Sequence, residues 1–479
     1  MEIEPVIGLE IHTELLTESK VFCGCSTKFG SPPNTQTCPV CLGMPGTLPV
    51  LNKRALELSL KTALALNCNI PEVMSFDRKN YYYPDLPKNY QISQKYHQLG
   101  VEGYINLVLP EYEKKIGISD IHLEEDAGKN THPDEPGHQG ESWVDLNRAG
   151  QPLLEIVSAP DMRSLEEMEC YMNTMRSLLL YLEVSDCKME AGKLRFEVNV
   201  SIREKGTEEF GTRVEIKNLN SMKIAMKAAA HEIKRQKEVL EDGGNIRQET
   251  RLWDDARGVT ESMRSKEEAQ DYRYFPEPDL EEVAVDKEWL EDIRKNLPEL
   301  QDTKRQRFIE EYGIPSYDAG VLVVDKSVAD YFEECTKLHN NPKAFSNWIM
   351  VEIWRELREK EMDIPDFPVT PKHLSEMVKL IDNKTISSKI AKTVFGEMIE
   401  SGEMPDVIVK KKGLVQVSDE GELQKFVEQV INENPGPVED FKSGKEQAIT
   451  FLMGQMMKLT RGKANPQMVR EMLIKQMKQ

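Results

Sequence analysis

The pattern that most constrains the fold is an alternation of apolar and polar side chains near the N-terminus, over residues 6–12. Alternation with a period of two predicts a β-strand with one buried face and one polar face. The polar face carries Glu10 and His12, and Glu14 follows in phase. The apolar face comprises Ile7, Leu9 and Ile11. A strand that directs two acids and a histidine the same way is a candidate position for a metal ion and for catalysis.

The same alternation returns in residues 195–202 and 213–217. The polar link between them contains Gly206 and Gly211, so the two segments predict an antiparallel hairpin with one buried and one polar face. The polar face would hold Arg195, Glu197, Asn199, Arg213, Glu215 and Lys217. These segments predict a largely antiparallel sheet.

From about residue 293 the apolar residues recur at helical spacing instead, first through residues 293–312. Residues 402–405 suit a linker, and residues 435–437 interrupt the helical pattern of the tail. A chain of 479 residues has room for roughly two to four domains. We therefore predict an α+β fold with three domains. A sheet-containing domain spans residues 1–292, an all-helical domain spans 293–405, and a small helical tail spans 406–479.

Four of the eight cysteines lie close together, spaced Cys23-x-Cys25 and Cys38-x-x-Cys41. Two close pairs separated by about a dozen residues can surround one tetrahedral ion, which predicts a structural zinc site. A catalytic zinc is disfavoured because four sulfur ligands leave no open coordination position. The alternative is four reduced cysteines packed in a loop-rich knuckle.

Acidic residues recur on or beside the expected strands, at Glu10, Glu124, Glu125, Asp126, Glu190, Glu197 and Glu215. Carboxylates with a histidine suit a hard cation such as Mg²⁺, which keeps several waters and binds substrate phosphates. The alternative is a solvated sheet face whose acids pair with nearby bases. Strict alternation groups Glu124 with His122, whereas Glu125 turns toward them only if the strand ends at Glu124. The sequence leaves both possibilities open.

No phosphate-binding glycine motif of the P-loop, dinucleotide-binding or protein-kinase kind is present. Arg78 and Lys79 lie just before three consecutive tyrosines, a combination that suits phosphates and stacked bases. The alternative is a tyrosine-rich edge of the core with solvated charges.

The formal net charge of −20 argues against a protein that coats nucleic acid over its whole surface. Residues 441–479 are nevertheless basic, and this basic tail either contacts RNA or is a solvated helical face. Its cations are Lys442, Lys445, Lys458, Arg461, Lys463, Arg470, Lys475 and Lys478, and its acids are Glu446 and Glu471.

No apolar run approaches the roughly 18 residues of a membrane span, and the N-terminus lacks a signal-peptide pattern. We expect a cytoplasmic protein with no membrane partner.

Several longer motifs resemble the GatB family of tRNA-dependent amidotransferase subunits, nearly from end to end. They are residues 8–12, 38–43, 76–81, 83–88, 122–129, 144–150, 214–221, 271–279 and 451–455. The resemblance implies an N-terminal cradle with a kinase-like site, a helical domain and a tRNA-binding tail. It also implies a heterotrimer with a glutaminase subunit, GatA, and a small clasp subunit, GatC, acting on a mischarged tRNA.

The activity that the resemblance implies uses ATP to activate the side-chain carboxylate of Glu-tRNA(Gln) or Asp-tRNA(Asn) as an acyl phosphate, which ammonia from GatA then displaces. The implied catalytic residues are Glu10, His12, Glu125 and Glu215, and the implied phosphate contacts are Arg78, Lys79, Arg195 and Lys217. The implied ligands are Glu10, His12, Glu125, Glu190 and Glu215 for Mg²⁺, and Cys23, Cys25, Cys38 and Cys41 for Zn²⁺.

One segment departs from the family pattern. Where the family usually has Cys and Asp, this chain has Phe196 and Glu197, so the charge is kept on a longer side chain and the metal can lie differently. Two other hypotheses fit the residues without the resemblance. A metal-dependent RNA phosphoesterase would cleave RNA without ATP, and a non-catalytic RNA-binding scaffold would lose only stability in Glu10→Ala or Glu125→Ala.

Overall fold

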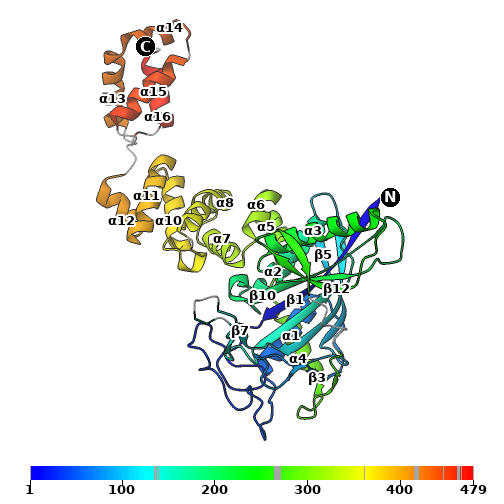
Figure 1. Cartoon of the computed structure of the whole chain (residues 1–479). Helices are drawn as coiled ribbons and strands as arrows, with labels where there is room; N and C mark the ends of the chain where they lie inside the picture. Colours follow the sequence, from blue (N-terminus) through cyan, green and yellow to red (C-terminus); the bar gives the residue numbers. More distant parts are fainter. Residues whose placement is uncertain are drawn as a thin grey trace. The chain divides into compact units, whose positions relative to one another are not determined.

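The computed structural model describes residues 2–133, 137–138, 140–263, 271–360, 362–414, 420–445, 447–460, 464 and 466–477. The chain forms two compact units, Met1–Leu300 and Gln301–Gln479. The first unit contains the sheets and the second is helical, so the predicted α+β class is confirmed (Figure 1). The division into three domains at residues 292 and 405 stays a prediction.

An eight-stranded sheet forms the centre of the described part of the first unit, in the order β13-β12-β11-β10-β1-β9-β6-β5. Its neighbouring strands are antiparallel except β11 and β12, so the largely antiparallel sheet is confirmed. The strands are β1 (Ile3–Glu14), β5 (Gly100–Val108), β6 (Glu113–Glu125), β9 (Pro152–Ser158), β10 (Leu194–Glu204), β11 (Val214–Lys217), β12 (Glu249–Asp254) and β13 (Val259–Ser262).

Helices cover the apolar side of this sheet. Helix α2 (Leu165–Tyr181) packs against β5, and α3 (Met222–Glu241) packs against β10 (Figure 1). The side-chain oxygens of Ser164 and Ser221 accept backbone hydrogen bonds at the starts of these helices, as N-cap serines do. The apolar residues of β1 belong to the core between sheet and helices: Ile7, Leu9 and Ile11. The polar residues of β1 therefore face the other side of the sheet.

The other elements of the first unit are mostly short. The helices are α1 (Lys53–Ala65), the 3₁₀ helix η1 (Met189–Ala191) and α4 (Lys287–Lys295). The strands are β2 (Val73–Met74), β3 (Asp77–Asn80), β4 (Tyr90–Ser93), β7 (Lys129–Thr131), β8 (Trp143–Asp145), β14 (Phe275–Pro276) and β15 (Val283–Ala284).

The described part of the second unit is helical and contains two separate apolar clusters. One includes Phe308 and Phe332, and the other includes Leu423 and Leu452. The elements are α5 (Gln301–Tyr312), α6 (Ser316–Leu322), α7 (Lys326–Leu338), α8 (Pro342–Trp348), the π-helix η2 (Ile349–Ile353), α9 (Trp354–Lys360), η3 (Ile364–Asp366), α10 (Pro371–Asp382), α11 (Ser388–Ser401), α12 (Pro405–Lys412), α13 (Glu420–Glu433), α14 (Pro435–Lys442), α15 (Gln447–Leu459) and α16 (Pro466–Met477). Among the described residues, no helix has the length and apolar character needed to cross a membrane.

Two local predictions need correction. The apolar pattern predicts one helix over residues 293–312, whereas α4 ends at Lys295 and α5 begins at Gln301, because Pro298 lies between them and disrupts helical hydrogen bonding. Residues 435–437 are predicted to separate tail helices near 420–434 and 445–459, and α13 does end at Glu433, but Pro435 also begins the unpredicted helix α14, where the missing N–H of proline is not needed. Of the charged residues named for the basic tail, four lie outside the described part of the chain: Arg461, Lys463, Lys478 and Glu446.

Candidate functional site

Four neighbouring strands bring a row of charged side chains together on the polar face of the sheet. His12 in β1 is paired with Glu155 in β9 and with Arg195 in β10. Glu155 is in turn paired with His122 in β6. Since side chains at paired positions of neighbouring strands are in contact range, the register alone assembles this row.

Glu155 joins the two histidines. Its Oε2 atom lies 3.2 Å from His12 Nε2 and 3.0 Å from His122 Nε2. His12, Glu124 and Glu155 each offer a ligand atom within 4.8 Å of the others, and we call them the histidine group. The Nδ1 atom of His12 is buried and has no hydrogen-bond partner among the described residues, which leaves a nitrogen available to a metal ion. The three side chains of the histidine group together offer a nitrogen and carboxylate oxygens, which suit a divalent cation.

A second set of acids, which we call the carboxylate group, comprises Glu10, Glu197 and Glu215, whose oxygens also lie within 4.8 Å of one another. Glu10 and Glu197 are directly paired across β1 and β10, and like charges in that position repel each other. Lys217 offsets part of the repulsion, with Nζ 3.1 Å from Glu197 Oε2 and 3.4 Å from Glu215 Oε1. Asn199 donates a hydrogen bond to Glu10 Oε1 at 3.0 Å. The excess of carboxylates suits a further cation.

The pKa values on this face reflect the same excess of negative charge. Burial alone would lower the pKa of His12, but the nearby acids, Glu155 foremost, raise it to about 9. The same balance raises the pKa of His122 to about 10. Burial raises the pKa of Glu10, and the charges of Glu155 and Glu197 raise it further. Both groups therefore attract positive charge strongly.

Arg195 lies at the end of the row and pairs with Asp126. Its Nη2 atom is 3.3 Å from Asp126 Oδ2, and Arg148 Nε lies 3.5 Å from the same oxygen. Burial opposes ionisation of Asp126, but the two guanidinium groups lower the pKa of that carboxyl. Of the four predicted phosphate contacts, Arg195 and Lys217 thus lie on the polar face of the main sheet.

Arg78 lies in β3, in a separate small sheet, and its charge is already matched. Its Nε atom lies 2.7 Å from Glu277 Oε2, and its Nη2 atom lies 2.8 Å from Glu277 Oε1 and 3.1 Å from Asp279 Oδ2. The Glu277 side chain is fully buried. This arrangement favours a structural ion pair, so the phosphate contact implied for Arg78 stays a prediction.

Lys79 lies beside tyrosines, and the charges of acids on the main sheet affect its pKa. Its Nζ atom is 5.8 Å from the centre of the Tyr81 ring and 5.1 Å from that of Tyr272. Burial would lower the pKa of Lys79, but the charge of Glu124 contributes to raising it. Lys79 therefore combines a cation with aromatic rings near the histidine group.

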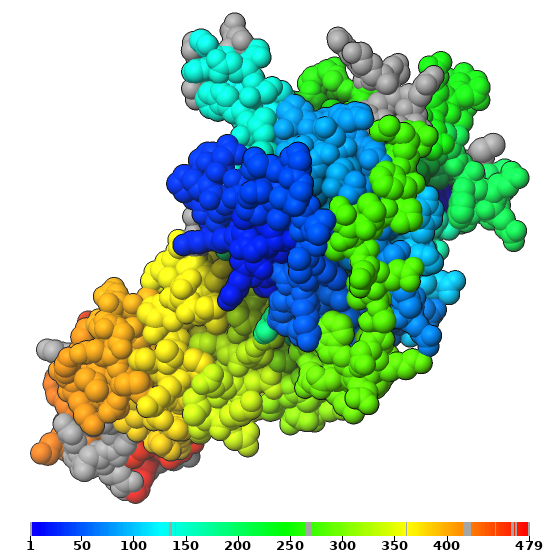
Figure 2. Space-filling view, turned by 90° about the horizontal axis from the view of Figure 1, so that it is seen from below, coloured from blue at the N-terminus to red at the C-terminus, as the bar shows by residue number. Residues whose placement is uncertain are grey.

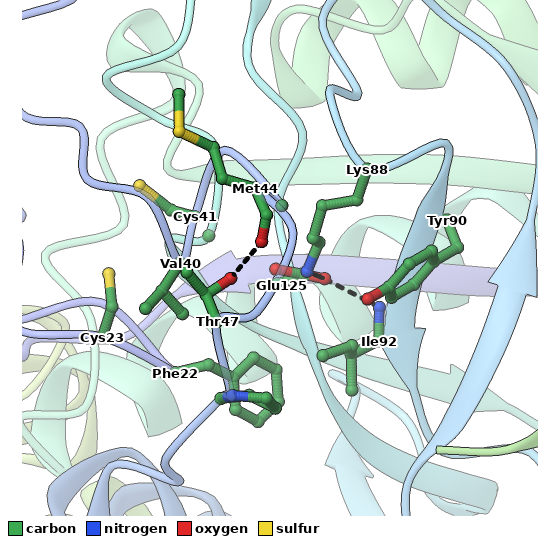
Figure 3. A pocket seen from close by; sticks show the side chains of 13 residues that line it. Phe22, Cys23, Val40, Cys41, Met44, Thr47, Lys88, Tyr90, Ile92 and Glu125 are labelled. Atoms are coloured by element: carbon green, nitrogen blue, oxygen red, sulfur yellow. Dashed lines mark hydrogen bonds and ion pairs between the residues drawn. The ribbon is translucent and has the colours of Figure 1, made fainter. Parts of the chain in front are cut away.

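Glu125 faces away from both groups, because the alternation of β6 continues through it and places Glu124 beside Glu155. Its Oε1 atom accepts the backbone N–H of Ile92 at 2.8 Å and forms an ion pair with Lys88. This pair lines a cavity of about 80 Å³ whose wall also includes Cys23 and Cys41 (Figure 3).

Glu190 lies in η1, apart from the strands. In the described part of the chain, neither Glu125 nor Glu190 belongs to a group of three or more metal-ligating side chains within 4.8 Å. The magnesium role that the resemblance implies for these two residues stays a prediction, and the geometry favours Glu124, Glu155 and Glu197 instead.

The four cysteines converge in a loop-rich segment, residues 19–50, which we call the knuckle. Their thiols are free, and their Sγ atoms lie within 4.8 Å of one another. The Sγ atoms of Cys38 and Cys41 are 3.9 Å apart. Zn–S bonds of about 2.3 Å in a tetrahedron require sulfurs about 3.8 Å apart, so the spacing fits zinc. In Figure 2 the knuckle, in dark blue, lies at the surface beside the lighter blue residues near 80–100.

Glu155 is the site residue that sequence reasoning missed. It is the one acid in the segment Pro152–Ser158, which otherwise reads as a buried apolar strand. A single carboxylate within an apolar strand could have identified it from the sequence, since such a carboxylate needs a charged or hydrogen-bonding partner.

Two family models match the chain, the GatB/GatE catalytic domain over residues 5–291 and the GatB domain over residues 330–477. The chain belongs to the GatB family. The catalytic-domain match of this GatB chain includes the histidine group, the carboxylate group and the knuckle.

Relatives match it over nearly their whole length, and each is named as the B subunit of an aspartyl/glutamyl-tRNA(Asn/Gln) amidotransferase. The relative from Carboxydothermus hydrogenoformans is 55% identical over 98% of both chains. That from Caldanaerobacter subterraneus subsp. tengcongensis is 56% identical over 99% of both, and that from Thermodesulfovibrio yellowstonii is 53% identical over 100% of both. The family resemblance expected from the motifs is thus confirmed.

Proposed function

We propose that this GatB chain is the subunit of a tRNA-dependent amidotransferase that activates mischarged tRNA with ATP. The substrates are Glu-tRNA(Gln), Asp-tRNA(Asn) or both, and the products are Gln-tRNA(Gln) and Asn-tRNA(Asn). The near-full-length identity to amidotransferase subunits supports the reaction. The observation that carries the mechanism is the convergence of the histidine and carboxylate groups on one face of the sheet.

The partners in this proposal are the glutaminase subunit GatA, which releases ammonia, and the clasp subunit GatC, in a cytoplasmic heterotrimer. The relatives are named as one subunit of an amidotransferase, which supports an assembly of several different chains. The basic tail contacts the tRNA, and its described cations are Lys442, Lys445, Lys458, Arg470 and Lys475.

In this proposal Mg²⁺ binds on the polar face of the sheet. One set of candidate ligands is His12, Glu124 and Glu155, and the other is Glu10, Glu197 and Glu215. A bound Mg²⁺ ion supplies charge neutralisation at the phosphate oxygens of ATP.

The charged side chains around these groups supply the rest of the chemistry. When the substrate carboxylate attacks the γ-phosphorus of ATP, the bond from that phosphorus to the bridging oxygen breaks, ADP leaves, and negative charge spreads over the transferred phosphoryl oxygens. Arg195 and Lys217 lie beside the acids and are partly exposed, so they can stabilise that charge. Lys79 is a further phosphate contact. Ammonia then attacks the activated carbonyl carbon, and inorganic phosphate leaves with an oxygen that came from the substrate carboxylate.

Neither alternative finds support in the comparisons. A metal-dependent RNA phosphoesterase and a non-catalytic RNA-binding scaffold would share the acidic groups, the knuckle and the basic tail, but the relatives carry the name of an amidotransferase subunit. The dependence on ATP distinguishes the amidotransferase from the phosphoesterase.

The test uses the chain reconstituted with its glutaminase and clasp partners. The complex is incubated with ³²P-labelled ATP, Mg²⁺, glutamine and either Glu-tRNA(Gln) or Asp-tRNA(Asn), and phosphate release and amide formation are followed. We expect ATP turnover that requires mischarged tRNA and is lost in Glu215→Ala, while tRNA binding remains. Glu125→Ala in the same assay tests the catalytic role implied for Glu125. RNA cleavage without ATP, or no turnover with either tRNA, would contradict the proposal.

The knuckle is a structural zinc centre in this proposal. Replacing Cys41 by Ser removes one of four sulfur ligands, so we expect loss of the stoichiometric zinc and a melting temperature lower by several degrees, because the metal couples to folding. Elemental analysis and thermal unfolding measure both. Cys170→Ser, in α2 and away from the knuckle, is the control and should keep its zinc. An unchanged zinc content in Cys41→Ser would contradict the four-cysteine centre.

A further inference from the structure

Lys20 is a fully buried lysine inside the knuckle, with no exposed surface. Its Nζ atom donates to the carbonyl oxygens of Gln36 at 2.8 Å and Leu146 at 3.4 Å, and to the sulfur of Cys41 at 3.6 Å. Lysine is almost never fully buried unless its charge is paired. The surroundings of this ammonium group therefore indicate where its counter-charge lies.

No carboxylate supplies that counter-charge in the described part of the chain, where the hydrogen-bond acceptors of the ammonium group are two carbonyls and one sulfur. Carrying a lone ammonium ion into the interior costs several kcal/mol, and carbonyl dipoles offset only part of this. Four thiolates around one Zn²⁺ ion have a formal charge of about −2. A loaded metal centre thus provides the negative charge that Lys20 lacks.

The backbone around Lys20 is also hydrogen-bonded to the four-cysteine centre. The N–H of Lys20 donates to the carbonyl of Cys25 at 3.0 Å, so the residue contacts both cysteine pairs. The next N–H, that of Val21, donates to the carbonyl of Gly150 at 3.0 Å.

Gly150 allows this close approach. Its φ of +86° lies in the left-handed region, and an added Cβ would lie 3.4 Å from the Lys20 side chain and 3.5 Å from Cys41. Lys20 therefore lies between the metal centre and the loop over residues 146–150.

We propose that Lys20 is the charge partner of the four-cysteine metal centre, donating a hydrogen bond to the Cys41 thiolate and joining the centre to the loop at Leu146. The role rests on the zinc centre proposed above. Groups that hydrogen-bond to metal ligands typically contribute about 10–100-fold to metal affinity. Lys20 is thus a positioning residue for the metal.

The test compares the full-length chain with its Lys20→Met variant, which keeps most of the side-chain volume and loses the charge and the donor. Zinc affinity is measured by competition with a chromophoric chelator. We expect binding weaker by about 10–100-fold in Lys20→Met. Lys28→Met removes an exposed lysine from the same knuckle and should bind zinc like the unmodified chain.

The outcomes separate the two proposals. If the unmodified chain binds no zinc, the zinc centre itself is wrong. If the unmodified chain binds zinc and Lys20→Met binds it as tightly as Lys28→Met does, the role of Lys20 is wrong.

Should Lys20→Met fail to fold, Lys20→Gln keeps a polar donor without the charge. The measurement is then the rise in melting temperature on adding zinc. We expect a smaller rise than in the unmodified chain, and an equal rise would overturn the proposal.

Discussion

We expect Glu155→Gln to lower the rate of tRNA-dependent ATP turnover by roughly 10²–10³-fold, the loss typical of removing one preorganised electrostatic contact from an active site. The reason lies in one oxygen of Glu155, which contacts both His12 and His122. Glutamine keeps the size of the side chain but loses its charge, so the two imidazoles lose their shared counter-charge. The proposed magnesium set also loses one of its three ligands.

The measurement is phosphate release by the reconstituted complex at saturating ATP and mischarged tRNA, together with tRNA affinity. We expect kcat to fall while tRNA affinity stays the same, because the proposed tRNA contacts lie in the basic tail. Glu113→Gln, at the exposed start of β6, is the matched control and should keep full activity. Unchanged turnover in Glu155→Gln would show that the histidine group is not part of the active site.

We expect Lys88→Met to lower the free energy of unfolding by about 3–5 kcal/mol, because the substitution leaves a buried carboxylate without its partner. The side chains of Lys88 and Glu125 are 8% and 4% exposed, so solvent cannot replace the lost ammonium group. Urea unfolding of the full chain measures the effect. Lys129→Met, on the exposed side of β7, is the control and should change stability little.

A double variant identifies the cause. If the destabilisation comes from the unpaired charge of Glu125, adding Glu125→Gln to Lys88→Met removes that charge and recovers most of the loss. The backbone N–H of Ile92 can still donate to the glutamine oxygen. Additive losses in the double variant would instead assign the effect to packing around the cavity.

The sheet could be predicted because burial on one face determines which residues alternate. Ile7, Leu9 and Ile11 in β1 are all at most 1% exposed, as their alternation with polar residues requires. The break between α4 and α5 was not predicted, since the apolar spacing continues through residues 296–300 and Pro298 alone decides against one helix. The start of α14 at Pro435 shows the opposite case, in which proline begins a helix.

The site was predictable only in part, because pairing between strands distant in the sequence brings it together. Glu10 and His12 share a strand, so their common direction follows from the alternation. Glu155 joins them through the register of β1 with β9, which no local pattern encodes. Likewise, no pattern in the sequence around Lys20 predicts its buried contact with Cys41. The choice of Glu124 over Glu125 depended on where β6 ends.

The central claim is that this polar face phosphorylates the substrate carboxylate, and oxygen transfer tests it most directly. The mischarged tRNA is prepared with ¹⁸O in the side-chain carboxylate, and the inorganic phosphate released with ATP and glutamine is analysed by mass spectrometry. Our account predicts phosphate that carries one ¹⁸O atom from the substrate, formed only with ATP and strongly reduced in Glu155→Gln. Phosphate without ¹⁸O, released at the rate of amide formation, would contradict activation through an acyl phosphate.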